Sequence, residues 1–146
     1  MKKSILVLVS LLLIAAAIAG CGGTAPAPTV PPSGAGAAAS APVPADIDVQ
    51  QAAQLRDAGA FILDVREPNE WEQVHIPGAT LIPLGTLQAR ANEVPKDKQV
   101  VVICHSGNRS KVGRDTLKKA GFTNVTSVNG GMNAWSAAGY PTVSGK

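Results

Sequence analysis

The chain reads Val100-Val101-Val102-Ile103-Cys104-His105-Ser106-Gly107-Asn108-Arg109-Ser110 in its last third, and this stretch decides the fold. Its first four residues are β-branched and none is polar, which predicts a strand buried on both faces, as in the middle of a parallel sheet. Cys104 follows directly, and after a short turn a helical pattern begins at about Ser110. The stretch therefore predicts a buried strand, a loop that starts with a cysteine, and a helix.

Helical and strand patterns alternate on both sides of this stretch. We expect helices over 49–58, 68–73, 86–92, 110–120 and 132–138, and strands over 61–65, 79–84, 100–103 and 125–128. Asp48 lies three residues before Gln51, the spacing of a capping box at the first helix. This alternation predicts a single α/β domain with a mainly parallel central sheet and helices on both faces. Ligands of such sheets bind beyond the carboxyl ends of the strands, where Cys104 falls.

The loop after Cys104 combines groups that stabilise an anion. A helix start offers unpaired N–H groups and a favourable dipole, and Gly107 lets several amides converge on one point. Arg109 adds a permanent charge whose fork suits a tetrahedral oxyanion and which favours a thiolate. We therefore predict that Cys104 is a reactive, catalytic thiolate rather than a buried inert one. The candidate substrate-binding residues are His105, Ser106, Gly107, Asn108, Arg109 and Ser110, although Ser110 can equally serve only as a helix cap.

Further short motifs surround this loop in a specific order. They are Asp64-Val65-Arg66, Glu70-Trp71, His75-Ile76-Pro77-Gly78-Ala79, Ile82-Pro83, Gly121-Phe122, Gly130-Gly131 and Trp135. With the cysteine loop they make the chain from about Asp46 to Tyr140 resemble the single-domain rhodanese-like sulfurtransferases. The resemblance implies that the Cys104 thiolate attacks the outer sulfur of thiosulfate, that sulfite leaves, and that a thiol or cyanide collects the sulfur from a Cys104 persulfide.

The size of the loop bears on the substrate that the resemblance implies. Related phosphatases of this fold place five residues between cysteine and arginine, whereas four lie between Cys104 and Arg109, which favours sulfur over a phosphoryl group. Relatives that use mercaptopyruvate typically lack the arginine, so Arg109 favours thiosulfate. The position after the cysteine is often Arg or Lys in this family, and here it is His105. Donor preference and pH optimum therefore stay open.

Polar residues outside the loop are predicted to support the structure of the active site. Asp64 ends a strand beside the expected site and can orient the loop, and Arg66 with Glu70 resembles an ion pair of the family. For all three a structural network is favoured over direct catalysis. His75 precedes a turn signal and is predicted to make structural hydrogen bonds. No further His or Cys lies at ligand spacing, so the sequence predicts neither a metal site nor a cofactor.

The first 20 residues have the pattern of a secretory signal. Lys2 and Lys3 precede an apolar run over 5–19, and Ile18-Ala19-Gly20-Cys21 resembles the lipobox of bacterial lipoproteins. The resemblance implies cleavage before Cys21 and lipidation of its thiol. We then expect residues 21–45 to form a flexible tether rich in Ala, Pro and Gly, and residues 46–146 to form the domain. An ordinary signal peptide with an incidental cysteine is the alternative.

Charge and cysteine count follow from this processing. Loss of Lys2 and Lys3 leaves 11 basic residues against 10 acidic ones, which gives no indication of nucleic-acid binding. Lipidation of Cys21 leaves Cys104 as the one free thiol. We expect a monomeric domain, anchored by lipid on the extracytoplasmic side of the cell membrane or the outer membrane.

Three functions compete for such a chain. The first is a thiosulfate sulfurtransferase that moves sulfane sulfur to a thiophilic acceptor. The second is a persulfide carrier or sulfur-sensing module that serves a partner protein and hardly turns over small donors. The third is a non-catalytic interaction domain, against which the intact cysteine loop argues. The first two need the same thiolate, so the sequence separates them poorly.

Overall fold

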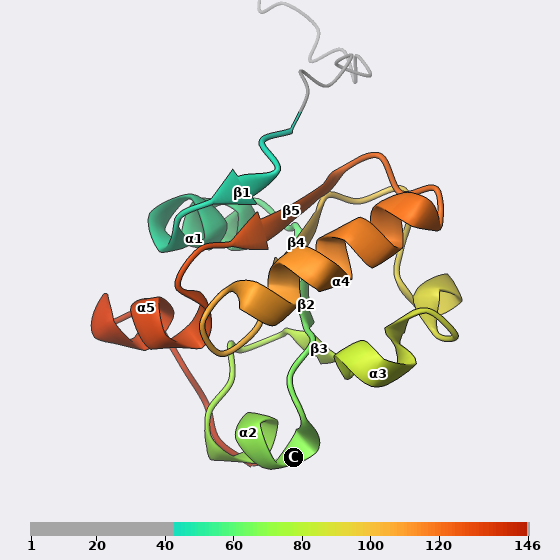
Figure 1. Cartoon of the computed structure of the whole chain (residues 1–146). Coiled ribbons are helices and arrows are strands. Elements are labelled where there is room, and N and C mark those ends of the chain that lie inside the picture. The colour runs from blue at the N-terminus through green and yellow to red at the C-terminus, as the bar shows by residue number, and fades with distance from the viewer. Residues whose placement is uncertain (1–42, 146) are drawn as a thin grey trace, which may run out of the picture. The chain divides into compact units, whose positions relative to one another are not determined.

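A five-stranded parallel sheet forms the centre of the domain, in the order β1-β5-β4-β2-β3 (Figure 1). The structure is a computed structural model and describes residues 43–145. Its strands are β1 Asp46–Ile47, β2 Phe61–Asp64, β3 Thr80–Leu81, β4 Val100–Ile103 and β5 Val125–Val128. β4 lies in the middle and all four of its residues are buried, as its β-branched run predicts. The predicted class, a parallel sheet within a single α/β domain, is confirmed.

The helices lie on both faces of this sheet. They are α1 Val49–Asp57, α2 Pro68–Gln73, α3 Leu84–Leu87, α4 Asn108–Lys119 and α5 Gly131–Ala137, with one turn of 3₁₀ helix at Ala91–Glu93. α1 begins at the predicted capping box: the Gln51 amide donates to Asp48 Oδ1 at 2.8 Å, and the Gln51 side chain accepts from the Asp48 amide. α2 begins with Pro68, whose missing N–H costs nothing at a first helical position.

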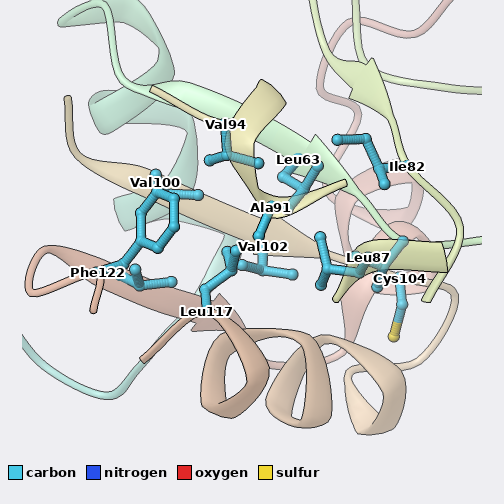
Figure 2. Close-up of a cluster of buried hydrophobic side chains, with 12 residues drawn as sticks. Leu63, Ile82, Leu87, Ala91, Val94, Val100, Val102, Cys104, Leu117 and Phe122 are labelled. Carbon is cyan, nitrogen blue, oxygen red and sulfur yellow. The ribbon is translucent and has the colours of Figure 1, made fainter. Parts of the chain in front are cut away.

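The side chains of the strands alternate between two apolar clusters, one on each face of the sheet. In β4, Val100 and Val102 join α3 and α4 through Leu87 and Leu117 (Figure 2). The other two β4 residues, with Ile62 of β2, pack against α1 and α5, where the indole of Trp135 is fully buried. Figure 2 shows Cys104 at one end of the first cluster, next to Leu87. Helices therefore pack on both faces of β4, the strand that leads to the cysteine.

Several predicted boundaries are wrong for local reasons. The two-residue strand β1 was not predicted, because Asp46 and Ile47 are too few to show a pattern. The strand expected over 79–84 contains only β3, and its pairing with β2 ends near Pro83, which has no N–H to donate. The helix expected over 86–92 is instead the short α3 followed by the 3₁₀ turn.

The start of α4 departs from the prediction in a way that concerns the cysteine loop. The helix begins at Asn108, two residues before the expected start, because Gly107 serves as its N-cap with φ +100°. A side chain at this position would be strained by that φ and pressed against the Val128 carbonyl oxygen, 3.2 Å from its β-carbon. Glycine therefore permits the sharp entry into the helix, and the loop between strand and helix is shorter than expected.

The predicted signal segment, Cys21 and most of the tether lie outside the described residues. Within 43–145 no helix is long and apolar enough to cross a membrane. Residues 44 and 45, which we assigned to the tether, are attached to the sheet: the Thr126 hydroxyl donates to the Pro44 carbonyl oxygen at 2.7 Å, and the Ser127 amide donates to the Ala45 carbonyl oxygen at 2.9 Å. The contacts of the sheet thus include residues slightly before Asp46.

Candidate active site

Cys104 lies directly after β4, at the carboxyl edge of the sheet. The residue is 1 % exposed, and the Gly107 amide donates a hydrogen bond to its sulfur at 3.1 Å. A donor aimed at sulfur stabilises a thiolate or a persulfide, because charge on the sulfur strengthens the hydrogen bond. The predicted placement of the cysteine beyond a strand end is confirmed.

The first turn of α4 supplies further donors beside the sulfur. The backbone amides of Asn108, Arg109 and Ser110 have no acceptor among residues 43–145, as is usual at a helix start. The Ser110 hydroxyl is buried and donates to the Gly107 carbonyl oxygen at 2.8 Å. Ser110 is therefore not the helix cap; it holds the loop in its curved form. His105, Ser106 and Asn108 are exposed and form the rim of the site.

The loop rests on the segment that follows β5, a support the sequence did not predict. The Met132 amide donates to the Cys104 carbonyl oxygen at 2.8 Å, and the Asn133 amide donates to the His105 carbonyl oxygen at 3.1 Å. A β-carbon on Gly131 would overlap the Cys104 carbonyl oxygen. The Gly130-Gly131 pair was visible in the sequence as a motif, but only the fold shows that Gly131 makes room for the cysteine loop.

Arg109 is bound to Glu70, so the predicted pairing of Glu70 with Arg66 is wrong. Nη1 and Nη2 of Arg109 each donate to a separate Glu70 carboxylate oxygen at 2.7 Å. The His105 Nδ1 atom lies 3.8 Å from the same carboxylate. The contact joins α2 to the first turn of α4 across 39 residues of sequence. It holds the guanidinium beside the cysteine loop and partly neutralises its charge.

Arg66 pairs with Asp64 instead, and both side chains are buried. Arg66 Nη2 donates to Asp64 Oδ2 at 2.6 Å and to the Val74 carbonyl oxygen at 2.7 Å, while Nη1 donates to the Glu70 carbonyl oxygen at 3.2 Å. The pair therefore ties the end of β2 to the middle and the C-terminal end of α2. Asp64 has no hydrogen bond to the cysteine loop among the described residues, so its influence on the loop runs through Arg66 and α2.

His75 makes structural contacts, as the sequence predicts. Its ring stacks on Trp71 with a centroid distance of 3.7 Å, and its Nδ1 lies 2.9 Å from the Trp71 carbonyl oxygen. Its backbone pairs with Val143 in both directions, which fastens the C-terminal segment to α2. No cluster of three or more potential metal ligands occurs within 43–145.

The ion pair with Arg109 makes the free energy of unfolding at low pH depend on the charge of Glu70. The hydrogen bonds from Arg109 lower the pKa of Glu70 from 4.5 to about 2. A carboxyl with a lower pKa in the folded state adds stability above its unfolded pKa, and loses that contribution as the pH falls from about 4.5 to about 2. We expect the free energy of unfolding to fall less steeply in this window for Glu70→Gln than for the parent. Urea unfolding at stepped pH measures both slopes, and equal slopes would contradict the assignment.

Comparison with known protein families gives a single consistent match. The model of the rhodanese-like domain matches residues 48–138. The candidate sulfur carrier protein YrkF of Bacillus subtilis is 48% identical over 79 residues, which are 54% of this chain and 43% of YrkF. The thiosulfate sulfurtransferase GlpE of Pseudomonas syringae is 38% identical over 92 residues, 63% of this chain and 86% of GlpE. The match thus spans most of one relative and less than half of the other.

A solved structure supports the same assignment. The crystal structure of a rhodanese-related protein from Thermoplasma volcanium superposes with a TM-score of 0.63 and is 34% identical in sequence. The superposition covers 67% of this chain and 96% of that one.

Proposed function

The chain belongs to the rhodanese-like domain family, and from that premise we propose that it transfers a sulfane sulfur from thiosulfate, or a similar donor, to a thiophilic acceptor through a persulfide on Cys104. Its relatives include a protein named as a sulfurtransferase and one named as a candidate sulfur carrier, so sulfur transfer is the general chemistry of these domains. What we propose for this chain is the identity of the donor and the persulfide intermediate on Cys104.

The contact between the Gly107 amide and the Cys104 sulfur carries the proposal. A thiolate held by an amide donor at the end of a buried strand is a ready nucleophile, and the open amides of the first turn of α4 suit the oxygens of a leaving sulfite. The four-residue gap between Cys104 and Arg109 makes a small cradle, which fits sulfur better than a phosphoryl group.

The proposed reaction has two balanced steps. The Cys104 thiolate attacks the outer sulfur of thiosulfate, a sulfur–sulfur bond forms, and sulfite leaves with the electron pair of the bond that breaks. Cys104 then carries a persulfide. In the second step cyanide or a thiolate attacks the outer sulfur of that persulfide, and Cys104 leaves as the thiolate. No oxidant, metal or cofactor enters either step.

Intact mass measurement tests the first step. We expect the purified protein to gain the mass of one sulfur atom on mixing with thiosulfate and to lose it on addition of cyanide, with formation of thiocyanate. Peptide mapping should place the added sulfur on the Cys104 peptide and not on Cys21. Sulfur on neither cysteine at saturating thiosulfate would contradict the proposal.

A persulfide carrier for a partner protein is the second candidate. The exposed rim of the site, which His105, Ser106 and Asn108 form, offers a partner protein a surface to contact beside the sulfur. The similarity to YrkF points the same way. Persulfide formation from a protein donor with none from thiosulfate would support the carrier over the enzyme.

We also propose that the mature protein is a lipoprotein held on the extracytoplasmic face of a bacterial membrane through Cys21. The charged start, the apolar run and the cysteine occur in the order that such signals require. We expect Cys21→Ser to move the protein from the membrane pellet to the soluble fraction after cell fractionation. Unchanged retention in the pellet would rule out the anchor.

A further inference from the structure

The ion pairs beside the cysteine leave the charged part of the active site nearly neutral. Both Nη atoms of Arg109 donate to the Glu70 carboxylate at 2.7 Å, and the guanidinium of Arg66 is matched by the buried Asp64. Arg109 therefore does not present an unopposed positive charge, although its position in the loop suggests a receptor for anions. Within residues 43–145, the amides of the first turn of α4 have no acceptor and can bind an anion.

Glu70 is held rigidly in this position. The Glu67 amide donates to Glu70 Oε2 at 3.1 Å, and Arg66 Nη1 donates to the Glu70 carbonyl oxygen at 3.2 Å. The side chain is 25% exposed. A substrate anion that approaches Arg109 consequently meets a fixed carboxylate that it cannot displace without breaking hydrogen bonds on α2.

The charge on Arg109 and the sulfur of Cys104 influence each other. The hydrogen bonds to Glu70 are the main cause that raises the pKa of Arg109, and the negative charge of the Cys104 thiolate adds to the same shift. Arg109 lies in the first turn of α4, and the N-cap residue of that helix, Gly107, donates to the Cys104 sulfur. The Glu70 carboxylate bound to Arg109 therefore acts on any charged donor that binds at the sulfur. A dianion such as thiosulfate is repelled more than a donor without a sulfonate group.

We propose that Glu70 is a specificity-determining residue that slows sulfur transfer from dianionic donors such as thiosulfate relative to transfer from small persulfides, which the site would also accept. The inference rests on the proposed sulfur transfer through Cys104. With a persulfide donor, the Cys104 thiolate attacks the outer sulfur, the donor's sulfur–sulfur bond breaks, and the donor leaves as a thiolate. Cys104 keeps the sulfur as a persulfide, and no other reactant is needed.

Two donors of different charge test the proposal on the full chain. The rate of Cys104 persulfide formation is measured by quenched intact mass with thiosulfate and with the persulfide of 2-mercaptoethanol, which carries no sulfonate. We expect Glu70→Gln to raise the second-order rate with thiosulfate about three- to ten-fold. With the persulfide of 2-mercaptoethanol, which carries at most one negative charge, we expect a smaller change, within about two-fold, because Gln keeps the size of the side chain and an oxygen that can accept from Arg109.

Two control variants separate charge from structure. Glu72→Gln removes the same charge from an exposed position on α2, and neither rate should change. Glu70→Asp keeps the charge with a shorter side chain, and the ratio of the two rates should stay as in the parent. Melting temperatures confirm that each variant is folded.

The proposal falls if Glu70→Gln lowers the rate with thiosulfate, if it changes both rates alike, or if Glu70→Asp shifts their ratio as much as Glu70→Gln does. A parent protein that forms persulfide with both donors, at a ratio that Glu70→Gln does not move, would overturn this inference alone. A parent protein that forms none with either donor would overturn the proposed function together with it.

Discussion

Cys104→Ser is expected to lower the turnover of thiosulfate with cyanide by at least about a thousand-fold, to the uncatalysed rate. Serine matches the shape of cysteine, but its hydroxyl is not ionised near neutral pH and cannot hold a sulfane sulfur as a persulfide. Formation of thiocyanate, followed by its coloured iron complex, measures the loss. The variant should also gain no sulfur when it is mixed with thiosulfate.

The second cysteine of the chain is a matched control for this prediction. Cys21→Ser makes the same atomic change at a position before residues 43–145, which the structure describes, and we expect it to keep full turnover in solution. The Cys104 variant should stay folded, since a serine hydroxyl can accept from the Gly107 amide as the sulfur does. Turnover by Cys104→Ser at the parent rate would remove the persulfide mechanism altogether.

The elements that the sequence predicts correctly are those with a strong local signal. Val100–Ile103 is unbroken and β-branched, and it forms the buried central strand. The Asp48 and Gln51 pair predicts the start of α1, and Pro68 predicts the start of α2. In these places the residues that set the conformation are neighbours in sequence, so no knowledge of the remaining fold is needed.

The elements that sequence reasoning missed depend on partners far away in the chain. β1 is only two residues long and forms because Asp46 and Ile47 pair with β5, about 80 positions later. The early start of α4 depends on Gly107, whose close approach to Val128 cannot be read from the loop itself. Neither β1 nor the early start of α4 therefore produces a recognisable pattern among neighbouring residues.

The same contrast between local signals and distant partners applies to the active site. The cysteine loop was predicted as a unit because its donors and its cysteine are consecutive residues. The partner of Glu70 was predicted wrongly: the resemblance to the family implied an ion pair with Arg66, four residues earlier in the chain. The fold instead points the Arg66 side chain at Asp64, and this leaves Glu70 to meet Arg109 from the neighbouring element.

The second large effect is expected at this buried pair: Arg66→Met should lower the free energy of unfolding by about 3–5 kcal/mol. Arg66 is 1 % exposed and Asp64 is fully buried, so the variant leaves a carboxylate in the interior without its counter-charge. It also removes the hydrogen bonds that Arg66 donates to the carbonyl oxygens of Glu70 and Val74. Denaturation by urea, with the slope of the transition unchanged, measures the loss.

An exposed ion pair is the control for this loss. Arg90 and Glu93 are joined by two hydrogen bonds of 2.7 Å at the surface, and Arg90→Met should leave stability unchanged within error. If the two Arg variants lost equal stability, burial would not be the cause of the effect at Arg66.

The double variant Asp64→Leu with Arg66→Met separates the cost of an unpaired charge from the loss of the pair itself. A buried ion pair adds little net stability over apolar residues of similar size, because removing two charges from water offsets most of their attraction. We therefore expect the double variant to recover part of the stability that Arg66→Met loses. Its α2 would still lack the hydrogen bonds from Arg66 that hold the backbone of Glu70. Recovered stability with a rate of persulfide formation that still differs from the parent would show that the pair serves to place Glu70 and Arg109 beside the cysteine. Recovery of both the stability and the parent rate would show that the pair contributes to packing alone.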